Sequence, residues 1–127
     1  MIRQIEITLA ARKRGFHLVT DEIVRQLESL PRMGLLNLFV LLTIDGLRVY
    51  IAGDTEDIPE MASLGHIDIA LLPCNQPYTM TVDQLINAAR MVKPSVLYPY
   101  HYGQTDVSGI AAALAGDSID VRIRHYE

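Results

Sequence analysis

The sequence has a single cysteine, no excess of basic residues and no long hydrophobic run. Cys74 alone cannot form an internal disulfide, which favours a reducing compartment. The net charge of -4 excludes the basic footprint typical of nucleic-acid-binding proteins and of polybasic membrane-surface segments. The sequence contains no run of about 18 apolar residues, so no transmembrane helix is predicted. Apolar and polar residues alternate from the N-terminus onward, whereas a signal peptide would have a basic start and then a continuous apolar run. We therefore expect a cytoplasmic protein that binds neither nucleic acid nor a membrane.

The length and composition predict one globular domain. The chain has 127 residues, and 50% of them are hydrophobic. A chain of this size buries roughly two-thirds of the surface that its unfolded form exposes, so one core is the default. No internal repeat or low-complexity linker divides the sequence, and we expect residues 1–127 to form a single domain.

The first 31 residues predict a strand, a short return strand and a helix. Residues 2–10 alternate between apolar and polar side chains, which is typical of a half-buried strand, and residues 16–19 follow as a short strand. Thr20 is then expected to cap a helix that runs to Leu30. Pro31 is expected to stop it, because proline lacks the N–H that the helix interior needs.

A hairpin is predicted next. The mostly apolar stretch 35–43 indicates a buried strand, and residues 47–51 indicate its partner. Between them lies Asp45-Gly46, a dipeptide that favours a two-residue hairpin turn because both positions need positive φ.

From residue 55 onward the sequence alternates between helical and strand patterns. Thr81 and Gln84 have the spacing of a capping box at the start of a helix, which Lys93-Pro94 is expected to end. The other predicted elements are helices at 55–64 and 106–115 and strands at 67–72, 95–100 and 120–124. Such alternation predicts an α/β fold with a mostly parallel sheet and helices packed on it, preceded by the antiparallel hairpin region.

Polar residues follow three of the predicted strands. Binding sites of parallel sheets gather beyond the carboxyl ends of the strands, where the sequence places Asp54, Cys74-Asn75 and His101. A carboxylate and an imidazole are suitable ligands for zinc and similar metals. The alternative is structural, since an aspartate at a strand end often caps a helix and a histidine between two tyrosines often makes ordinary hydrogen bonds.

Three motifs resemble the metallo-β-lactamase-fold hydrolases. Residues 50–55 (Tyr-Ile-Ala-Gly-Asp-Thr) are similar to the family's strand-to-loop motif with a metal-binding aspartate, and residues 98–103 (Tyr-Pro-Tyr-His-Tyr-Gly) are similar to its later histidine motif. Residues 75–81 resemble a loop and helix start of a bacterial branch. The resemblance covers about residues 39–127 and implies half of an αββα fold. It also implies Asp54 and His101 as ligands of zinc or manganese, with a small ester, lactone or phosphate-bearing substrate.

The family's principal ligand motif is missing from this chain. That motif, His-x-His-x-Asp-His, supplies most of the metal ligands and the aspartate general base, and a further family histidine is also missing. A catalytic zinc usually takes three protein ligands and a water whose pKa it lowers towards about 7. Asp54 and His101 are the two positions that carry over, with Tyr78 and Thr79 in the neighbouring loop as candidate substrate-binding residues. The catalytic group itself is unassigned.

The N-terminal segment has a second resemblance. Residues 14–23 and 34–39 look like the start of the secondary thiamine-phosphate synthase family, whose next stretch, His-Thr-Ser-Ala-Ser, is replaced here by residues 41–45. We therefore expect residues 1–42 to have a different ancestry from residues 43–127.

The remaining histidines and the cysteine each have a structural and a functional interpretation. His17 is a possible third ligand but is better explained as structural. His66 precedes its strand and is expected at the opposite edge of the sheet, and His125 is expected in solvent. Cys74 could bind a soft metal, yet a free cysteine is usually a small buried group.

Three hypotheses for the function follow. The first is a metal-dependent hydrolase of a small-molecule substrate, with its metal site incomplete in this chain. The second is a non-catalytic domain that self-associates, because half of the fold would leave an apolar sheet face uncovered; a homo-oligomer is therefore expected. The third is a thiamine-phosphate synthase-like transferase.

Overall fold

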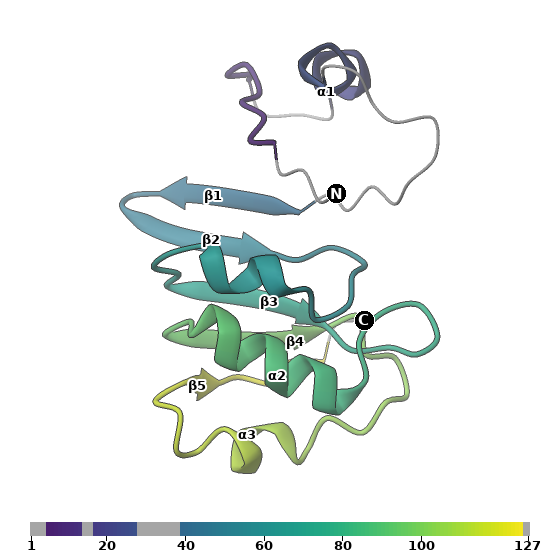
Figure 1. Ribbon diagram of the computed structural model, residues 1–127, viewed down its shortest axis with the longest axis vertical. Coiled ribbons are helices and arrows are strands. Elements are labelled where there is room, and N and C mark those ends of the chain that lie inside the picture. The colour runs from purple at the N-terminus through teal and green to yellow at the C-terminus, as the bar shows by residue number, and fades with distance from the viewer. Residues whose placement is uncertain (1–4, 14–16, 28–38, 126–127) are drawn as a thin grey trace. The chain divides into compact units, whose positions relative to one another are not determined.

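The computed structural model describes residues 5–13, 17–27 and 39–125. These residues belong to two compact units, one extending to residue 35 and the other beginning at residue 36 (Figure 1). Each unit is described by itself below. Among the described residues, no helix is long and apolar enough to cross a lipid bilayer.

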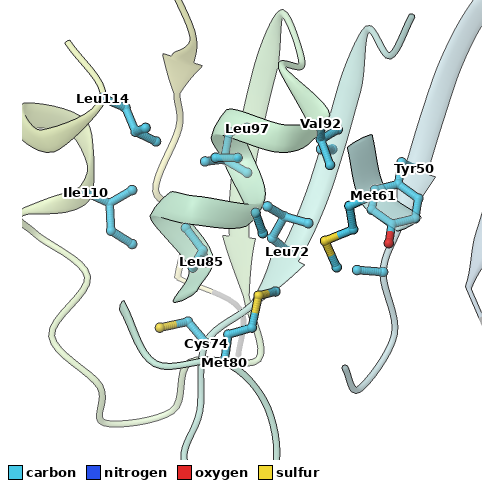
Figure 2. Close-up of a cluster of buried hydrophobic side chains, with 14 of the residues drawn as sticks. Tyr50, Met61, Leu72, Cys74, Met80, Leu85, Val92, Leu97, Ile110 and Leu114 are labelled. Carbon is cyan, nitrogen blue, oxygen red and sulfur yellow. The ribbon is translucent and has the colours of Figure 1, made fainter. Parts of the chain in front are cut away.

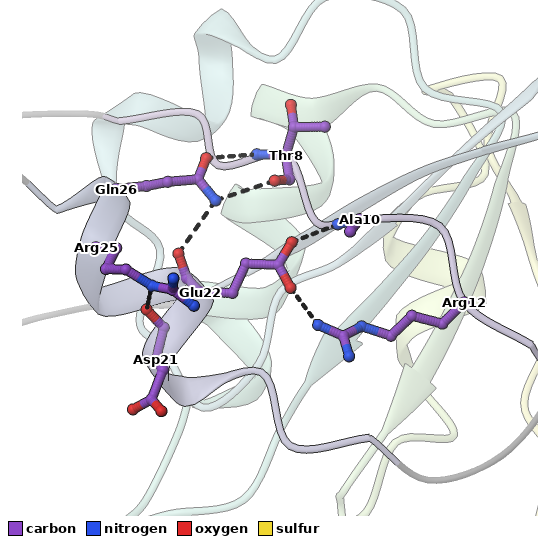
Figure 3. Close-up of polar contacts among 7 residues, drawn as sticks. All are labelled: Thr8, Ala10, Arg12, Asp21, Glu22, Arg25 and Gln26. Atoms are coloured by element: carbon purple, nitrogen blue, oxygen red, sulfur yellow. Dashed lines mark hydrogen bonds and ion pairs between the residues drawn. The ribbon is translucent and has the colours of Figure 1, made fainter.

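In the described part of the first unit, side chains of helix α1, Thr20–Gln26, bond to a segment without regular secondary structure, residues 8–12 (Figure 3). The Glu22 carboxylate accepts hydrogen bonds from the Ala10 N–H and from Arg12. The Gln26 side chain accepts from the Thr8 N–H at 3.3 Å and donates to the Thr8 carbonyl at 3.0 Å. The prediction of a strand over residues 2–10 is therefore wrong for the described part. The backbone groups of Thr8 and Ala10 form hydrogen bonds with side chains of a helix and not with a neighbouring strand.

The start of α1 also differs from the prediction. Val19 is the N-cap and makes no side-chain cap bond, so Thr20 is the first helical residue and does not cap the helix. Residues 17–19 form no strand. Leu27 ends the described helix, and the predicted stop at Pro31 lies outside the described residues, as does the beginning of the strand predicted from residue 35.

The second unit contains a five-stranded sheet in the order β1-β2-β3-β4-β5 (Figure 1). The strands are β1 Val40–Ile44, β2 Leu47–Ile51, β3 Ile69–Pro73, β4 Val96–Tyr100 and β5 Asp120–Val121. β1 pairs with β2 antiparallel, and all later neighbours are parallel. Asp45 and Gly46 form the hairpin turn with φ of 49° and 85°. The predicted α/β fold, with its antiparallel hairpin and parallel sheet, is confirmed.

Three helical segments connect the parallel strands: η1 Pro59–Ser63, α2 Val82–Val92 and α3 Ile110–Ala113. The capping box of α2 is confirmed, because Thr81 Oγ1 accepts from the Gln84 N–H at 3.1 Å and Gln84 Oε1 accepts from the Thr81 N–H at 2.9 Å. The other two helices are shorter than predicted. Thr55 donates its hydroxyl to the Glu56 carbonyl instead of capping a helix, and Asp106 forms a turn with the Ser108 N–H.

The core lies between the helices and one face of the sheet (Figure 2). α2 contributes four buried residues, Leu85, Ala88, Ala89 and Val92, in the i, i+3, i+4, i+7 pattern of an amphipathic helix. The sheet contributes Tyr50, Ala70 and Leu97, which lie side by side on β2, β3 and β4, and Leu72, two positions further along β3. This packing holds β2, β3 and β4 in order, so their carboxyl ends form one continuous edge.

Candidate metal centre

Asp54 and His101 meet at the carboxyl edge of the sheet. Asp54 follows β2 and His101 follows β4, and β3 lies between these two strands. His101 Nδ1 lies 3.0 Å from Asp54 Oδ1, although 47 positions separate the residues in sequence. The structure therefore confirms the prediction that this carboxylate and this imidazole lie together at one edge of the sheet.

Backbone geometry at the strand ends produces this contact. The ladder continues past the strands, with the Ala52 N–H donating to the Leu71 carbonyl at 3.1 Å and the Cys74 N–H donating to the Tyr100 carbonyl at 3.2 Å. The chain then turns sharply through positive φ, at 67° for Gly53 and 50° for His101. Positive φ is uncommon for residues other than glycine, although histidine adopts it more readily than most, and it breaks the strand alternation at this position. Both side chains can thus reach over the end of β3.

The pair is open to solvent. The side chain of Asp54 is 64% exposed and that of His101 is 41% exposed, so other groups can approach both. Tyr100 lies beside them. Burial raises the pKa of the Tyr100 hydroxyl, and the negative charge of Asp54 raises it further. Tyr100 is the neighbour of the site that the sequence analysis missed, and its place directly before His101 was the available signal.

Asp54 and His101 fit part of a metal site. Two ligands about 2.1 Å from a tetrahedral zinc lie about 3.4 Å apart, so Nδ1 and Oδ1, at 3.0 Å from each other, would have to separate slightly to bind one ion. A complete catalytic site needs a third protein ligand. Within residues 5–13, 17–27 and 39–125, no group of three His, Cys, Asp or Glu side chains is placed to hold a metal. The described chain therefore presents two candidate ligands without a third beside them.

The two candidate substrate-binding residues have different surroundings. Tyr78 is 73% exposed in the loop between β3 and α2. Thr79 is 2% exposed, and its hydroxyl accepts from the Asn75 N–H at 2.6 Å and donates to the Asn75 carbonyl at 3.2 Å. Thr79 thus stabilises the loop through its hydrogen bonds, while the side chain of Tyr78 is accessible to solvent. Contact of either residue with a substrate stays a prediction.

The other candidate residues each have contacts or surroundings of their own. His66 contacts Asp68 at 3.0 Å before β3, at the opposite edge of the sheet, as expected. His17 Nε2 lies 2.8 Å from the Lys13 carbonyl within the first unit. Cys74 is buried, which raises the pKa of its thiol, so it belongs to the core. His125 is exposed after β5.

The sequence of the chain matches a known protein family. The model of the Beta-lactamase superfamily domain matches residues 6–102. The chain belongs to this superfamily. The match includes both Asp54 and His101, and it confirms the predicted resemblance of the second unit. The resemblance of residues 14–39 to secondary thiamine-phosphate synthases stays a prediction, as does a different ancestry for residues 1–42, and part of that segment lies outside the described residues.

Individual relatives of the superfamily are named as metal-dependent hydrolases. The UPF0173 metal-dependent hydrolase of Archaeoglobus fulgidus is 32% identical over 91 residues, which are 65% of this chain and 39% of the relative. The UPF0173 metal-dependent hydrolase Ta0764 of Thermoplasma acidophilum is 40% identical over 65 residues, 49% of this chain and 29% of the relative. This chain therefore spans well under half the length of these relatives.

Solved structures agree with the fold. A Parabacteroides distasonis protein assigned as a metal-dependent hydrolase matches with a TM-score of 0.68 and 63% sequence identity, over 70% of this chain and 40% of that one. The metallo hydrolase Igni18 from Ignicoccus hospitalis matches with a TM-score of 0.56 and 29% identity, over 64% of this chain and 39% of that one. The partial coverage of both structures fits a half-domain of the superfamily fold.

Proposed function

We propose that this chain is part of a metal-dependent hydrolase, with Asp54 and His101 as metal ligands. The observation that carries the proposal is the 3.0 Å approach of His101 Nδ1 to Asp54 Oδ1 at the carboxyl edge of the sheet. This is the edge where ligands of parallel sheets gather. The names of the relatives, all metal-dependent hydrolases, support the same class of activity.

The proposed metal is zinc or manganese. A carboxylate and an imidazole suit both ions, and no cysteine competes at this position, because Cys74 is buried in the core. The remaining ligands must come from outside the described residues of one chain, since these supply only two.

The proposed substrate is a small ester, lactone or phosphate-bearing molecule. The edge is open enough for such a molecule, because Asp54 and His101 are 64% and 41% exposed. Tyr78 and Thr79, in the loop after β3, are the proposed contacts of this molecule, and the 73% exposure of Tyr78 supports its part in the proposal.

Metal content tests this proposal without an activity assay. The purified protein is loaded with zinc or manganese, dialysed, and analysed by elemental analysis, alongside the variants Asp54→Ala and His101→Ala. We expect metal in the wild type and at least about tenfold weaker metal binding in either variant, because even the loss of an outer-shell partner costs 10–100-fold.

His66→Ala is the matched control. It removes a carboxylate-paired imidazole of the same kind, 3.0 Å from Asp68 but at the other edge of the sheet, so its metal content should equal that of the wild type. Equal metal in Asp54→Ala and the wild type, or no metal in any protein, contradicts the proposal and leaves a non-catalytic domain.

A further inference from the structure

We infer that the hairpin turn Asp45-Gly46 is a site of spontaneous covalent modification, at which aspartate isomerises to isoaspartate and loosens the pairing of β1 with β2. The turn lies at the end of the hairpin (Figure 1). The other reactant is water, so the inference is independent of the proposed function. Three features of the turn favour the reaction: the residue after the aspartate, the surroundings of its carboxylate, and the exposure of the hairpin end.

The reaction passes through a five-membered imide. The backbone nitrogen of Gly46 attacks Cγ of the Asp45 carboxylic acid, the N–Cγ bond forms, and the Cγ–OH bond breaks. The hydroxyl leaves as water with the proton of the nitrogen. Water then adds to one of the two imide carbonyls. Opening of the N–Cγ bond restores aspartate, whereas opening of the bond from this nitrogen to the main-chain carbonyl carbon of Asp45 gives isoaspartate. The reaction thus needs no oxidant, reductant or metal.

The residue after an aspartate determines how closely its backbone nitrogen can approach the carboxyl carbon. Gly46 has no Cβ, and no atom lies within 4 Å of the position that a Cβ would occupy. Five other described aspartates precede a threonine, isoleucine or valine, whose branched Cβ crowds the reacting nitrogen. These aspartates are Asp54, Asp57, Asp68, Asp106 and Asp120. The steric barrier is therefore lowest at Asp45.

The carboxylate of Asp45 is not held by a charged partner. None of the ion pairs among the described residues includes it. Asp117 also precedes a small residue, Ser118, but Arg90 Nε holds its carboxylate at 3.2 Å. A carboxylate in an ion pair has to leave its partner before its carbon can reach the backbone. Asp117 should therefore react more slowly than Asp45, and it is the internal comparison for the experiment.

The end of the hairpin is open to solvent. Residues 44–47 are all exposed, and β1 is the outermost strand of the described sheet. The Asp45 backbone, with φ of 49°, has to rotate before Cγ meets the Gly46 nitrogen. Segments with few packed neighbours open locally at a small cost in free energy. The turn can therefore reach the reactive conformation without unfolding of the core.

Isoaspartate would alter the hairpin. Its main chain runs through Cβ and Cγ, so the turn gains one backbone carbon. The two-residue turn fixes the register in which Ile44 lies opposite Leu47 and Val40 lies opposite Ile51. A longer turn does not match this register, so the pairing of β1 with β2 should weaken.

Peptide mapping tests the site on the purified full chain. The folded protein is kept for several weeks at physiological pH and temperature in water enriched in heavy oxygen. Digestion and mass spectrometry with electron-transfer fragmentation then distinguish isoaspartate from aspartate at each position. We expect heavy oxygen and isoaspartate to accumulate at residue 45 faster than at Asp117. Equal accumulation at both positions, or none at residue 45, overturns the inference. Isoaspartate that forms at residue 45 only in a parallel sample in urea also overturns it.

Two variants test the imide. Asp45→Asn keeps a residue that favours this turn and forms the same imide with loss of ammonia, so it should yield aspartate and isoaspartate at residue 45. Asp45→Glu keeps the charge but would need a less favourable six-membered ring, so its main chain should stay unmodified. Circular dichroism checks that both variants fold. Modification of residue 45 at the same rate in Asp45→Glu and the wild type overturns the imide route.

The stability of the modified protein tests the effect on the hairpin. Ion-exchange chromatography separates the isoaspartyl form from the unmodified protein, and urea unfolding compares the two. The isoaspartyl form should unfold at a lower urea concentration, because its turn does not match the register of β1 and β2. Equal midpoints would overturn the loosening of the hairpin.

Discussion

Two carboxylate–imidazole pairs lie at opposite edges of the same sheet. His66 approaches Asp68, and His101 approaches Asp54, each at 3.0 Å. Asp68 also accepts a hydrogen bond from the Arg48 backbone N–H at 2.7 Å, so its carboxylate helps to tie β3 to β2. Asp54 is 64% exposed, and its side chain makes no such backbone bond within the described residues. The Asp68–His66 pair is therefore tied to the backbone of β2, whereas the Asp54–His101 pair is open to solvent.

The structural pair predicts a pH-dependent contribution to stability. The Arg48 N–H, and secondly His66, lower the pKa of Asp68 below its ordinary 3.8. A lowered pKa in the folded state stabilises the protein above the unfolded pKa, and this stabilisation is lost as the pH falls through the folded pKa. In urea unfolding, the wild type should exceed Asp68→Asn in free energy of unfolding at pH 7, and the difference should shrink below pH 3.8.

His66→Ala is the control for this prediction. It removes the hydrogen bond and the charge of His66 and leaves the Arg48 bond, which is the largest single cause, so part of the pH dependence should persist. A difference between the wild type and Asp68→Asn that stays constant from pH 7 to pH 2.5 (about one unit below the ordinary carboxyl range) contradicts this account of Asp68.

At the residue scale, the sequence predicted correctly which residues lie at which edge of the sheet, because this depends only on their position along a strand. Asp54 and His101 were predicted from the rule that parallel strands end at one edge, and His66 was assigned to the other edge by the same rule. Thr20 and Thr55 failed as helix caps, because a cap depends on whether the next turn becomes helical, and that depends on packing. For a third ligand, the sequence offered His17 as one possibility, and among the described residues no group of three possible metal ligands is found.

At the scale of elements, α2 is the best-specified part of the fold. Its capping box satisfies backbone N–H groups at both Thr81 and Gln84, and its buried stripe packs on the sheet (Figure 2). Lys93 then adopts the left-handed conformation, with φ of 51°, and ends the helix. Local signals and tertiary packing agree here, which explains why the sequence predicted this helix closely.

The cap predicts a measurable loss of stability. Thr81→Ala removes the oxygen that accepts the Gln84 N–H at 3.1 Å, and the free energy of unfolding should fall by about 1 kcal/mol. Urea denaturation followed by circular dichroism measures the change. The exposed turn residue Gln104 provides the control, because Gln104→Ala should stay within about 0.5 kcal/mol of the wild type. Equal stability of Thr81→Ala and the wild type would contradict the role of the cap.

The elements that were mispredicted are those in which local pattern and tertiary context disagree. Residues 5–10 alternate like a strand, yet Gln26 and Glu22 bond to their backbone from a helix (Figure 3). η1 and α3 are shorter than their sequence patterns, since Thr55 and Asp106 form local turns instead. Side chains that compete for nearby backbone groups favour turns over helices, and periodicity alone does not detect this competition.

At the scale of the whole molecule, the chain spans less than half the length of the relatives that it matches. It covers 40% of the Parabacteroides distasonis structure and 39% of Igni18. Among the described residues, the proposed metal site has two candidate ligands, and several apolar side chains of β1 and β2, such as Val40, Ile44 and Leu47, are about half exposed.

The central claim is that Asp54 and His101 bind a metal at the carboxyl edge of the sheet. Crystals grown with zinc, measured at the zinc absorption edge, test it most directly through an anomalous difference map. The account predicts a peak about 2.0–2.2 Å from an Asp54 carboxylate oxygen and from a His101 ring nitrogen. Zinc peaks only at other places, with His101 Nδ1 still hydrogen-bonded to Asp54 Oδ1, would contradict it.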